Sequence, residues 1–241
     1  MTTQTGTDTA ATAPTPEKAR YYGFSALVSG FARMWRATVP AVLVIVLNAI
    51  VQAGLVGSDP QVATSATFLA SLIASVVMFL IAGAVLCSGA YEAASGRISL
   101  GSAFGRARRN FLRFTLWVGL MTILVVAAAT LNPVVGIVVA WVLVYVPIAA
   151  VDDRGNPFAS NFAAIGRHPF RWIFTALIIA ILLAVGFLLG AFNTFLIGGF
   201  VGSLLAMLIG GLFSWWYLTT WACLYRSRVG DEGAEPSSPS A

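Results

Sequence analysis

The chain has 241 residues, of which 59% are hydrophobic and only 10% are charged. This polar content is too low to cover the surface of a water-soluble globule, so the composition predicts an integral membrane protein. The formal net charge of +5 does not indicate nucleic-acid binding, because the basic residues of a membrane protein are distributed according to its topology.

Both ends of the chain are predicted to be tails. Residues 1–16 are rich in Thr and Ala and lack the basic and apolar regions of a cleaved signal peptide. We therefore expect disordered cytoplasmic tails over residues 1–19 and 227–241, on either side of a membrane domain over residues 20–226.

Six apolar runs lie between the tails, and each is long enough to cross about 30 Å of hydrocarbon as a helix. Helices are expected rather than strands because the runs are continuously apolar. Their positions are 39–56, 67–89, 114–131, 133–151, 172–192 and 195–217. Tight turns are predicted at Asn132-Pro133 and Asn193-Thr194. The predicted fold is all-α, with six transmembrane helices arranged as three hairpins.

The basic residues predict the orientation of these helices. If the N-terminus is cytoplasmic, all 14 Lys and Arg residues fall in cytoplasmic segments. The positive-inside rule therefore predicts a multi-pass protein of the cytoplasmic membrane with both termini in the cytoplasm.

A short motif, Ser-x-Phe-x4-Arg, precedes each predicted hairpin and indicates an internal repeat. Its copies begin at Ser29, Ser102 and Ser160. Helical spacing groups apolar residues, such as Leu27, Phe31 and Met34 of the first copy, opposite the basic ones. Each copy is therefore predicted to form a basic amphipathic helix at the membrane interface. The Ser caps the helix, bonds back to its own backbone, or provides a small side chain for packing.

This interpretation assigns roles to the side chains of the motif and its neighbours. The predicted interfacial anchors are Phe31, Phe104 and Phe162. The predicted ligands of anionic lipid headgroups are Arg36, Arg106, Arg109, Arg113, Arg167 and Arg171.

Few other residues indicate chemistry. Asp152 and Asp153, with Glu92, provide oxygen ligands for a divalent cation, but a turn in which Asp caps the next helix is the favoured interpretation. The single histidine, His168, has no partner of a catalytic or metal-binding pattern. No catalytic residue, metal or cofactor is therefore predicted, and Cys87 and Cys223 are expected to be small buried residues.

Inside the predicted membrane helices the polar residues are uncharged. Asn48 and Gln52 lie one turn apart and either line a polar cavity or hydrogen bond to Ser71 and Ser75 of the second helix, the favoured alternative. Small residues recur at every fourth position, at Gly198, Gly202, Ala206, Gly210 and Ser214, and also at Gly186 and Gly190. They predict close packing of the last two helices, or of two copies of the chain, and a loosened fold on Gly202→Leu.

The basic segment before each hairpin, and the stretch Val151-Asp152-Asp153-Arg154-Gly155 followed by Phe162 and Arg167, resemble a broad group of poorly characterised bacterial six-helix membrane proteins. This group includes the membrane domain found beside some glycerophosphodiester phosphodiesterases. The resemblance covers most of residues 20–225 and implies a fold rather than an activity.

The sequence thus favours a non-enzymatic multi-pass membrane protein with a lipid-binding basic collar and an accessory or scaffold role. Its expected partners are anionic membrane lipids and a membrane protein or a second copy of the chain, not nucleic acid. The first alternative is a permease for a lipid-like or small neutral solute that uses Asn48 and Gln52. A more distant one is an enzyme that acts on lipid headgroups through Asp152 and Asp153.

Overall fold

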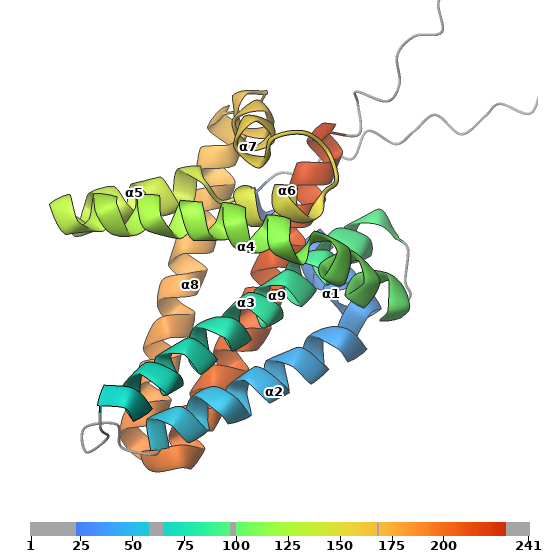
Figure 1. Cartoon of the computed structure of the whole chain (residues 1–241). Coiled ribbons are helices and arrows are strands. Elements are labelled where there is room, and N and C mark those ends of the chain that lie inside the picture. Colours follow the sequence, from blue (N-terminus) through green and yellow to red (C-terminus); the bar gives the residue numbers. More distant parts are fainter. Residues whose placement is uncertain (1–22, 58–64, 97–99, 168, 230–241) are drawn as a thin grey trace, which may run out of the picture.

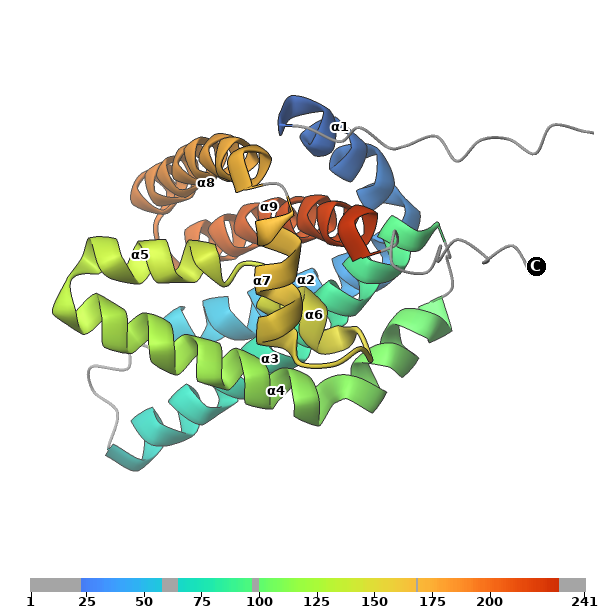
Figure 2. The same cartoon turned by 90° about the horizontal axis from the view of Figure 1, so that it is seen from above.

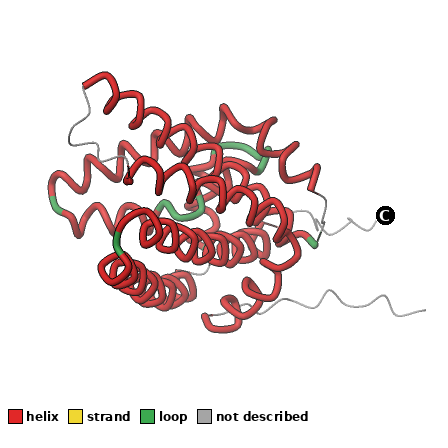
Figure 3. Tube along the Cα trace, turned by 90° about the horizontal axis from the view of Figure 1, so that it is seen from below, coloured by secondary structure: helices red, strands yellow, loops and turns green. Residues whose placement is uncertain are grey.

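The computed structural model of the protein describes residues 23–57, 65–96, 100–167 and 169–229 (Figure 1). All regular secondary structure in these ranges is helical (Figure 3). The expected tail over residues 1–19, most of the tail over 227–241, and His168 lie outside the described residues.

The helices follow one another with short connections. In chain order they are α1 (Gly23–Met34), the 3-10 turn η1 (Trp35–Ala37), α2 (Thr38–Gly57), α3 (Ser65–Ser95), α4 (Leu100–Leu131), α5 (Pro133–Val142), α6 (Val146–Val151), α7 (Pro157–Gly166), α8 (Pro169–Ile197) and α9 (Gly199–Val229).

Within the described residues, five helical segments are long and apolar enough to cross a membrane. They are Phe24–Leu55, Thr67–Ser95, Gly101–Leu131, Trp172–Phe192 and Gly199–Ser227. The chain is therefore an all-helical protein with the architecture of a multi-pass membrane protein. Helix α9 continues to Val229, three residues beyond the predicted end of the membrane domain at residue 226.

The prediction of one continuous helix over residues 133–151 is wrong. Helix α5 ends at Val142 and α6 begins at Val146, and the ten residues of α5 reach only about 15 Å. Pro147 is the physical reason: its ring would clash with the carbonyl of Leu143, four residues earlier, and it has no N–H to donate. Asn161 of α7 stabilises the break, because its Nδ2 donates to the Val142 carbonyl at 2.9 Å and its Oδ1 accepts from the Tyr145 N–H at 3.0 Å.

The turn predicted at Asn193-Thr194 is also misplaced. Helix α8 continues through these residues to Ile197, and the chain reverses at Gly198 and Gly199, whose φ angles are +65° and +57°. These left-handed conformations favour glycine, which has no Cβ to clash with the backbone. Gly198 is therefore a turn residue and not the first step of a packing ladder.

The three copies of the motif are all helical but differ in how they join the hairpins. The first copy lies in α1 and η1, which lead directly into α2, and the third lies largely in the separate helix α7. The second copy forms the first turns of α4, which runs without interruption from Leu100 to Leu131. The prediction of a separate interfacial helix before each hairpin is thus wrong for the second copy.

Helix α9 occupies the centre of the arrangement and packs against α1, α2, α3 and α8 (Figure 2). The indole of Trp215 donates to the Met34 carbonyl at 3.1 Å, and that of Trp216 donates to the Leu27 carbonyl at 3.0 Å. These hydrogen bonds attach α1 to the C-terminal half of α9. The α4–α5 hairpin runs across the other long helices rather than along them (Figure 1).

Candidate functional site

The described residues form two polar features: a charged cluster at one end of the bundle and a cavity between the long helices. The cluster is centred on Asp152, whose side chain is only 5% exposed. One carboxylate oxygen accepts from the Tyr91 hydroxyl of α3 at 3.1 Å, and the other accepts from the Tyr225 hydroxyl of α9 at 3.3 Å. One buried carboxylate therefore joins three helices.

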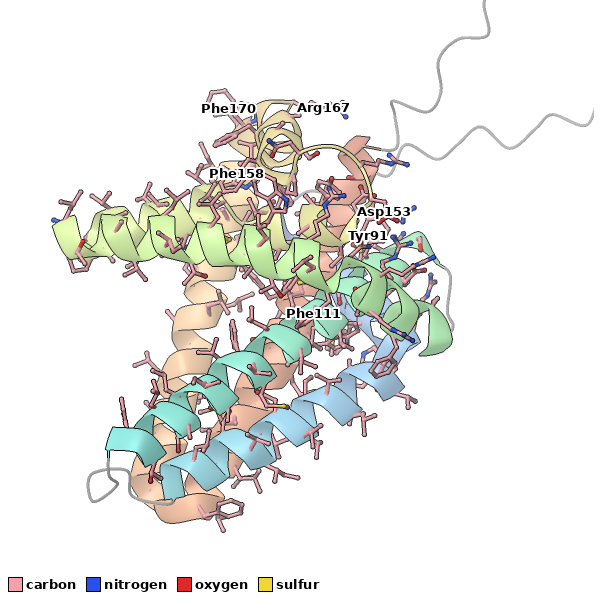
Figure 4. The ribbon with its side chains drawn as sticks, in the orientation of Figure 1. Tyr91, Phe111, Asp153, Phe158, Arg167 and Phe170 are labelled. Atoms are coloured by element: carbon pink, nitrogen blue, oxygen red, sulfur yellow. The ribbon has the colours of Figure 1, made fainter. Side chains whose placement is uncertain are left out.

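Arg106 of α4 connects to this cluster through several contacts. Its Nε lies 2.7 Å from a carboxylate oxygen of Glu92, and its Nη1 donates to the Val151 carbonyl at 3.3 Å. The guanidinium also lies over the Tyr91 ring, 4.7 Å from its centroid, and 3.9 Å from Asp153. Figure 4 shows Tyr91 and Asp153 in this region, where α3 and α4 meet the loop after α6.

Two of the predicted lipid ligands make contacts within the chain. Arg106 is mostly buried and engaged by Glu92, so its charge is neutralised within the protein. Arg113 donates to the carbonyls of Arg154 and Gly155 at 2.9 and 2.6 Å and holds the loop between α6 and α7. Both arginines contact their own chain, and helical spacing alone does not indicate this, because the carbonyls that they bind lie 41 to 45 positions away.

The cluster does not have the arrangement expected for a cation site. Glu92 is paired with Arg106, and Asp152 accepts two tyrosine hydroxyls. Among the described residues, no group of three His, Cys, Asp or Glu side chains lies close enough to hold a metal ion. The expectation that an Asp caps the following helix is also wrong, since the side chain of Asn156 accepts from the Phe158 N–H as the cap of α7.

Three of the predicted lipid ligands, Arg36, Arg109 and Arg167, are exposed. Arg171 lies in α8, and its side chain lies outside what the structure describes. The three predicted anchors also reach the surface: Phe31, Phe104 and Phe162 are between 38% and 52% exposed. Figure 4 places Arg167 with Phe170 beside α7, where α8 begins.

The apolar face of the first motif copy packs on protein. Leu27 and Met34 are buried, and a Cβ added at Gly30 would lie 2.8 Å from the Thr220 Cα of α9. Phe31 remains partly exposed, with its ring 6.1 Å from that of Trp216. The Ser29 hydroxyl donates back to the Ala26 carbonyl at 3.0 Å, which selects one of the three roles considered for this serine.

A partly open cavity of about 930 Å³ lies between α2, α3, α4 and α9. Asn48 and Gln52 both line it, as predicted for a polar cavity. Gln52 also pairs with Ser75 across the helices, because the Ser75 hydroxyl donates to its Oε1 at 2.9 Å and its Nε2 donates to the Ser75 carbonyl at 3.4 Å. Gln52 therefore realises both alternatives, whereas Asn48 lines the cavity and its Oδ1 has no hydrogen-bond partner among the described residues.

Two residues of the lining each carry a buried oxygen that has no hydrogen-bond partner among the described residues. The atoms are Oδ1 of Asn48 and Oγ1 of Thr115. Thr115 is not predictable from the sequence, because a single threonine in an apolar helix has no distinguishing signal. Tyr91, Tyr225 and Asn161 were also not predicted as site residues, because single polar residues of these types carry no distinguishing signal either.

The small residues of α8 and α9 do not form one continuous packing surface. Ala206, Gly210 and Ser214 line the cavity and also a second one of about 390 Å³ on the α8 side. A Cβ at Gly210 would meet no atom within 4 Å, whereas one at Gly211 would meet Ile45 of α2 at 3.3 Å or less. The tight contact of α9 with α2 therefore uses Gly211, outside the predicted ladder.

Both cysteines are buried and free, as expected. Comparison of the chain with protein-family models, with curated proteins and with solved structures finds no match. The resemblance to six-helix bacterial membrane proteins therefore remains an expectation based on the motifs.

Proposed function

We propose that this chain is a non-enzymatic, multi-pass protein of the cytoplasmic membrane, in which one basic end binds anionic lipids and serves an accessory or scaffold role. The observation that carries this proposal is the presence of exposed arginines, Arg36, Arg109 and Arg167, on the same three segments as the exposed Phe31, Phe104 and Phe162. Guanidinium groups pair with lipid phosphates, and phenylalanine rings insert at the acyl boundary.

Contacts between distant segments support a common basic end. Arg33 Nη1 of α1 donates to the Ala94 carbonyl of α3 at 2.9 Å, and Arg226 of α9 lies over the Tyr91 ring of α3 at 4.7 Å. The Arg106 contacts add α4 and the end of α6. We call five arginines the basic collar. They lie on the segments joined by these contacts or at the end of α7, and they are Arg36, Arg109, Arg154, Arg167 and Arg226.

In this proposal the chain crosses the membrane six times, and α5 and α6 together provide the fourth crossing. The α4–α5 hairpin then crosses at a tilt to the other long helices, since it lies across them (Figure 1). The two pieces and the turn between them cover residues 133–151, a length of about 19 residues that suits the bilayer. Asn161 satisfies backbone groups at the break, which is required for non-helical backbone at membrane depth. Both termini lie in the cytoplasm, since the connections expected outside contain no Lys or Arg.

Lipid retention tests this proposal. The full chain is reconstituted in nanodiscs of phosphatidylcholine with a minor fraction of phosphatidylglycerol, and the lipid that remains bound after detergent extraction is quantified by mass spectrometry. We expect phosphatidylglycerol to be enriched, and the triple variant Arg36→Gln, Arg109→Gln, Arg167→Gln to lose that enrichment, since each basic group contributes about 1 kcal/mol.

The matched control replaces the same three residues by Lys, which keeps the charge and is expected to keep most of the enrichment. Equal retention of the two lipids by the unmodified chain would contradict the proposal. So would a triple Gln variant that retains phosphatidylglycerol as well as the Lys variant does.

A second function, a permease for a lipid-like or small neutral solute, is favoured by one observation, the cavity that Asn48 and Gln52 line. Flux of such a solute into liposomes that contain the purified chain, compared with liposomes without protein, tests this alternative. Flux that Gly119→Leu in the cavity lining abolishes would favour it over a scaffold role.

A further inference from the structure

Helix α4 carries two arginines that the internal contacts of the chain leave unused. Arg108 and Arg109 are both exposed, and within the described ranges neither guanidinium makes a hydrogen bond or an ion pair. They differ in this from Arg106 and Arg113 of the same helix, whose guanidiniums bind carbonyls of the chain. Both charges are therefore available to an anion from outside the protein.

The two unused arginines border an open cleft along the first turns of α4. Its other described lining residues are small: Gly101, Ser102 and Gly105. A Cβ at Gly105 would meet no atom within 4 Å, so the cleft has room beside the helix for a group of several atoms. Among the described residues, no carboxylate lines it. Guanidinium groups bind phosphate oxygens through paired hydrogen bonds, so phosphate is the anion that fits this cleft.

The cavity between α2, α3, α4 and α9 lies on the same face of α4, which is one uninterrupted helix. Thr115 and Gly119 both line the cavity. They follow Arg108 by about two and three turns, so the three side chains share one side of the helix. Leu112 lies between them on this side and is 79% exposed. An accessible stripe therefore runs from the arginines to the cavity, which begins about 10 Å further along the helix axis.

The chemistry of the cavity suits hydrocarbon and not a headgroup. Its volume is about 930 Å³, and the described residues that line it are mainly aliphatic and aromatic, with no charged residue among them. A phosphate or an ammonium group would find no counter-charge there and would lose its hydration. In the proposed topology α4 enters the membrane from the cytoplasm, so the cavity lies deeper than the arginines, at the level of the acyl chains.

We propose that this face of α4 holds one anionic phospholipid, with its phosphate at Arg108 and Arg109 and an acyl chain in the cavity. The choline of a zwitterionic lipid would bring a positive charge to two arginines, so an anionic headgroup is favoured. A free phosphate would leave the cavity unfilled, so a lipid is favoured over a soluble anion. The inference rests on the proposed binding of anionic lipid by the basic end, and it adds Arg108 as a ligand and a place for the acyl chain.

Photo-crosslinking of the full chain tests both ends of this site. The chain is reconstituted in phosphatidylcholine nanodiscs with a sub-saturating fraction of phosphatidylglycerol that carries a diazirine in an acyl chain, and the labelled peptides are mapped by mass spectrometry. We expect labels on the cavity-lining parts of α2, α3, α4 and α9. Unlabelled phosphatidylglycerol should compete for them, and glycerol 3-phosphate, which lacks acyl chains, should not. The same diazirine on phosphatidylcholine should label these parts at least fivefold less.

The headgroup end is tested by the double variant Arg108→Gln, Arg109→Gln. We expect it to reduce cavity labelling by the phosphatidylglycerol probe at least tenfold, since each basic group near an anionic lipid changes affinity about fivefold. The matched control is Arg108→Lys, Arg109→Lys, which keeps both charges and should keep most of the labelling.

The acyl-chain end is tested by a pair of glycine variants. Gly119 lines the cavity and Gly54 of α2 does not, and a Cβ at either position would meet no atom within 4 Å. Gly119→Leu fills the cavity and should reduce cavity labelling at least fivefold, while Gly54→Leu should leave it unchanged. If Gly119→Leu does not yield monodisperse protein, the arginine variants decide the outcome.

Three results would overturn the inference and leave lipid binding by the basic end intact. The first is enrichment of phosphatidylglycerol without labels in the cavity, which would place its acyl chains on the outer surface. The second is cavity labelling that neither the Gln variant nor Gly119→Leu reduces. The third is equal labelling of the cavity by the phosphatidylcholine probe, which would show that the headgroup is not recognised. By contrast, an unmodified chain that does not enrich phosphatidylglycerol would refute the proposed function and this site with it.

Discussion

The hydroxyl of Tyr91 donates a hydrogen bond to the carboxylate of Asp152 across 3.1 Å, although 61 positions separate the two residues. The second oxygen of the same carboxylate accepts from Tyr225, 73 positions further along the chain. Asp152 therefore ties the end of α6 to α3 and α9. Arg106 extends this link to α4 through the carbonyl of the preceding residue, Val151.

We predict that Asp152→Ala destabilises the fold by about 3 kcal/mol, because it leaves two tyrosine hydroxyls without their acceptor in a buried environment. The melting temperature of the full chain in detergent measures this effect. Asp153→Ala is the matched control: its side chain is 66% exposed, so the loss should stay below about 1 kcal/mol. An equal loss in the two variants would show that Asp152 is not an organising residue.

A second prediction concerns Asn161, which lies at the break between α5 and α6. It satisfies both the Val142 carbonyl and the Tyr145 N–H, so Asn161→Ala should cost about 2–4 kcal/mol. Asn156→Ala, which removes the exposed cap of the same helix α7, should cost only about 1 kcal/mol. Thermal unfolding of the two variants compares these values, and a smaller effect at Asn161 would contradict its role.

The approach of α1 to α9 leads to a third prediction. A methyl group at Gly30 would lie 2.8 Å from the Thr220 Cα, and backbone atoms cannot rotate away as a side chain does. Gly30→Ala should therefore destabilise the fold by about 1–3 kcal/mol through overpacking. Gly210→Ala meets no atom within 4 Å and should leave the melting temperature unchanged or slightly higher. The reverse order would show that α1 does not pack on α9 as closely as described.

A fourth prediction concerns the number of membrane crossings. Leu131, at the tip of the α4–α5 hairpin, is 86% exposed, and the side chain of Arg154 is 64% exposed. Because Cys87 and Cys223 are buried, an impermeant maleimide reports on introduced cysteines. Leu131→Cys should react in intact cells, and Arg154→Cys should react only after permeabilisation.

Two labelling results would contradict this topology. Reaction of Arg154→Cys in intact cells would reverse the orientation. An unreactive Leu131→Cys, in a protein whose Arg154→Cys reacts after permeabilisation, would place the hairpin tip inside the membrane and reduce the number of crossings.

Properties that depend on short segments were predictable from the sequence. The length of each apolar run determines whether a helix reaches across a bilayer, and five of the six predicted runs correspond to long helices. The remaining run, over residues 133–151, contains Pro147. Its clash with the carbonyl four residues earlier is a local effect, so the break in this helix was also predictable from the sequence. The buried state of both cysteines was likewise expected from their apolar surroundings.

Only the tertiary structure decided which polar side chains pair with other parts of the chain and which glycines pack against another helix. Arg106 and Arg109 look equivalent in the sequence, yet Arg106 pairs with Glu92 while Arg109 is exposed. Gly210 and Gly211 are adjacent, yet only Gly211 approaches another helix. The physical reason is that hydrogen bonds, ion pairs and close packing act over a few ångströms between segments far apart in the chain, so they depend on how the helices are placed and not on the composition of any one helix.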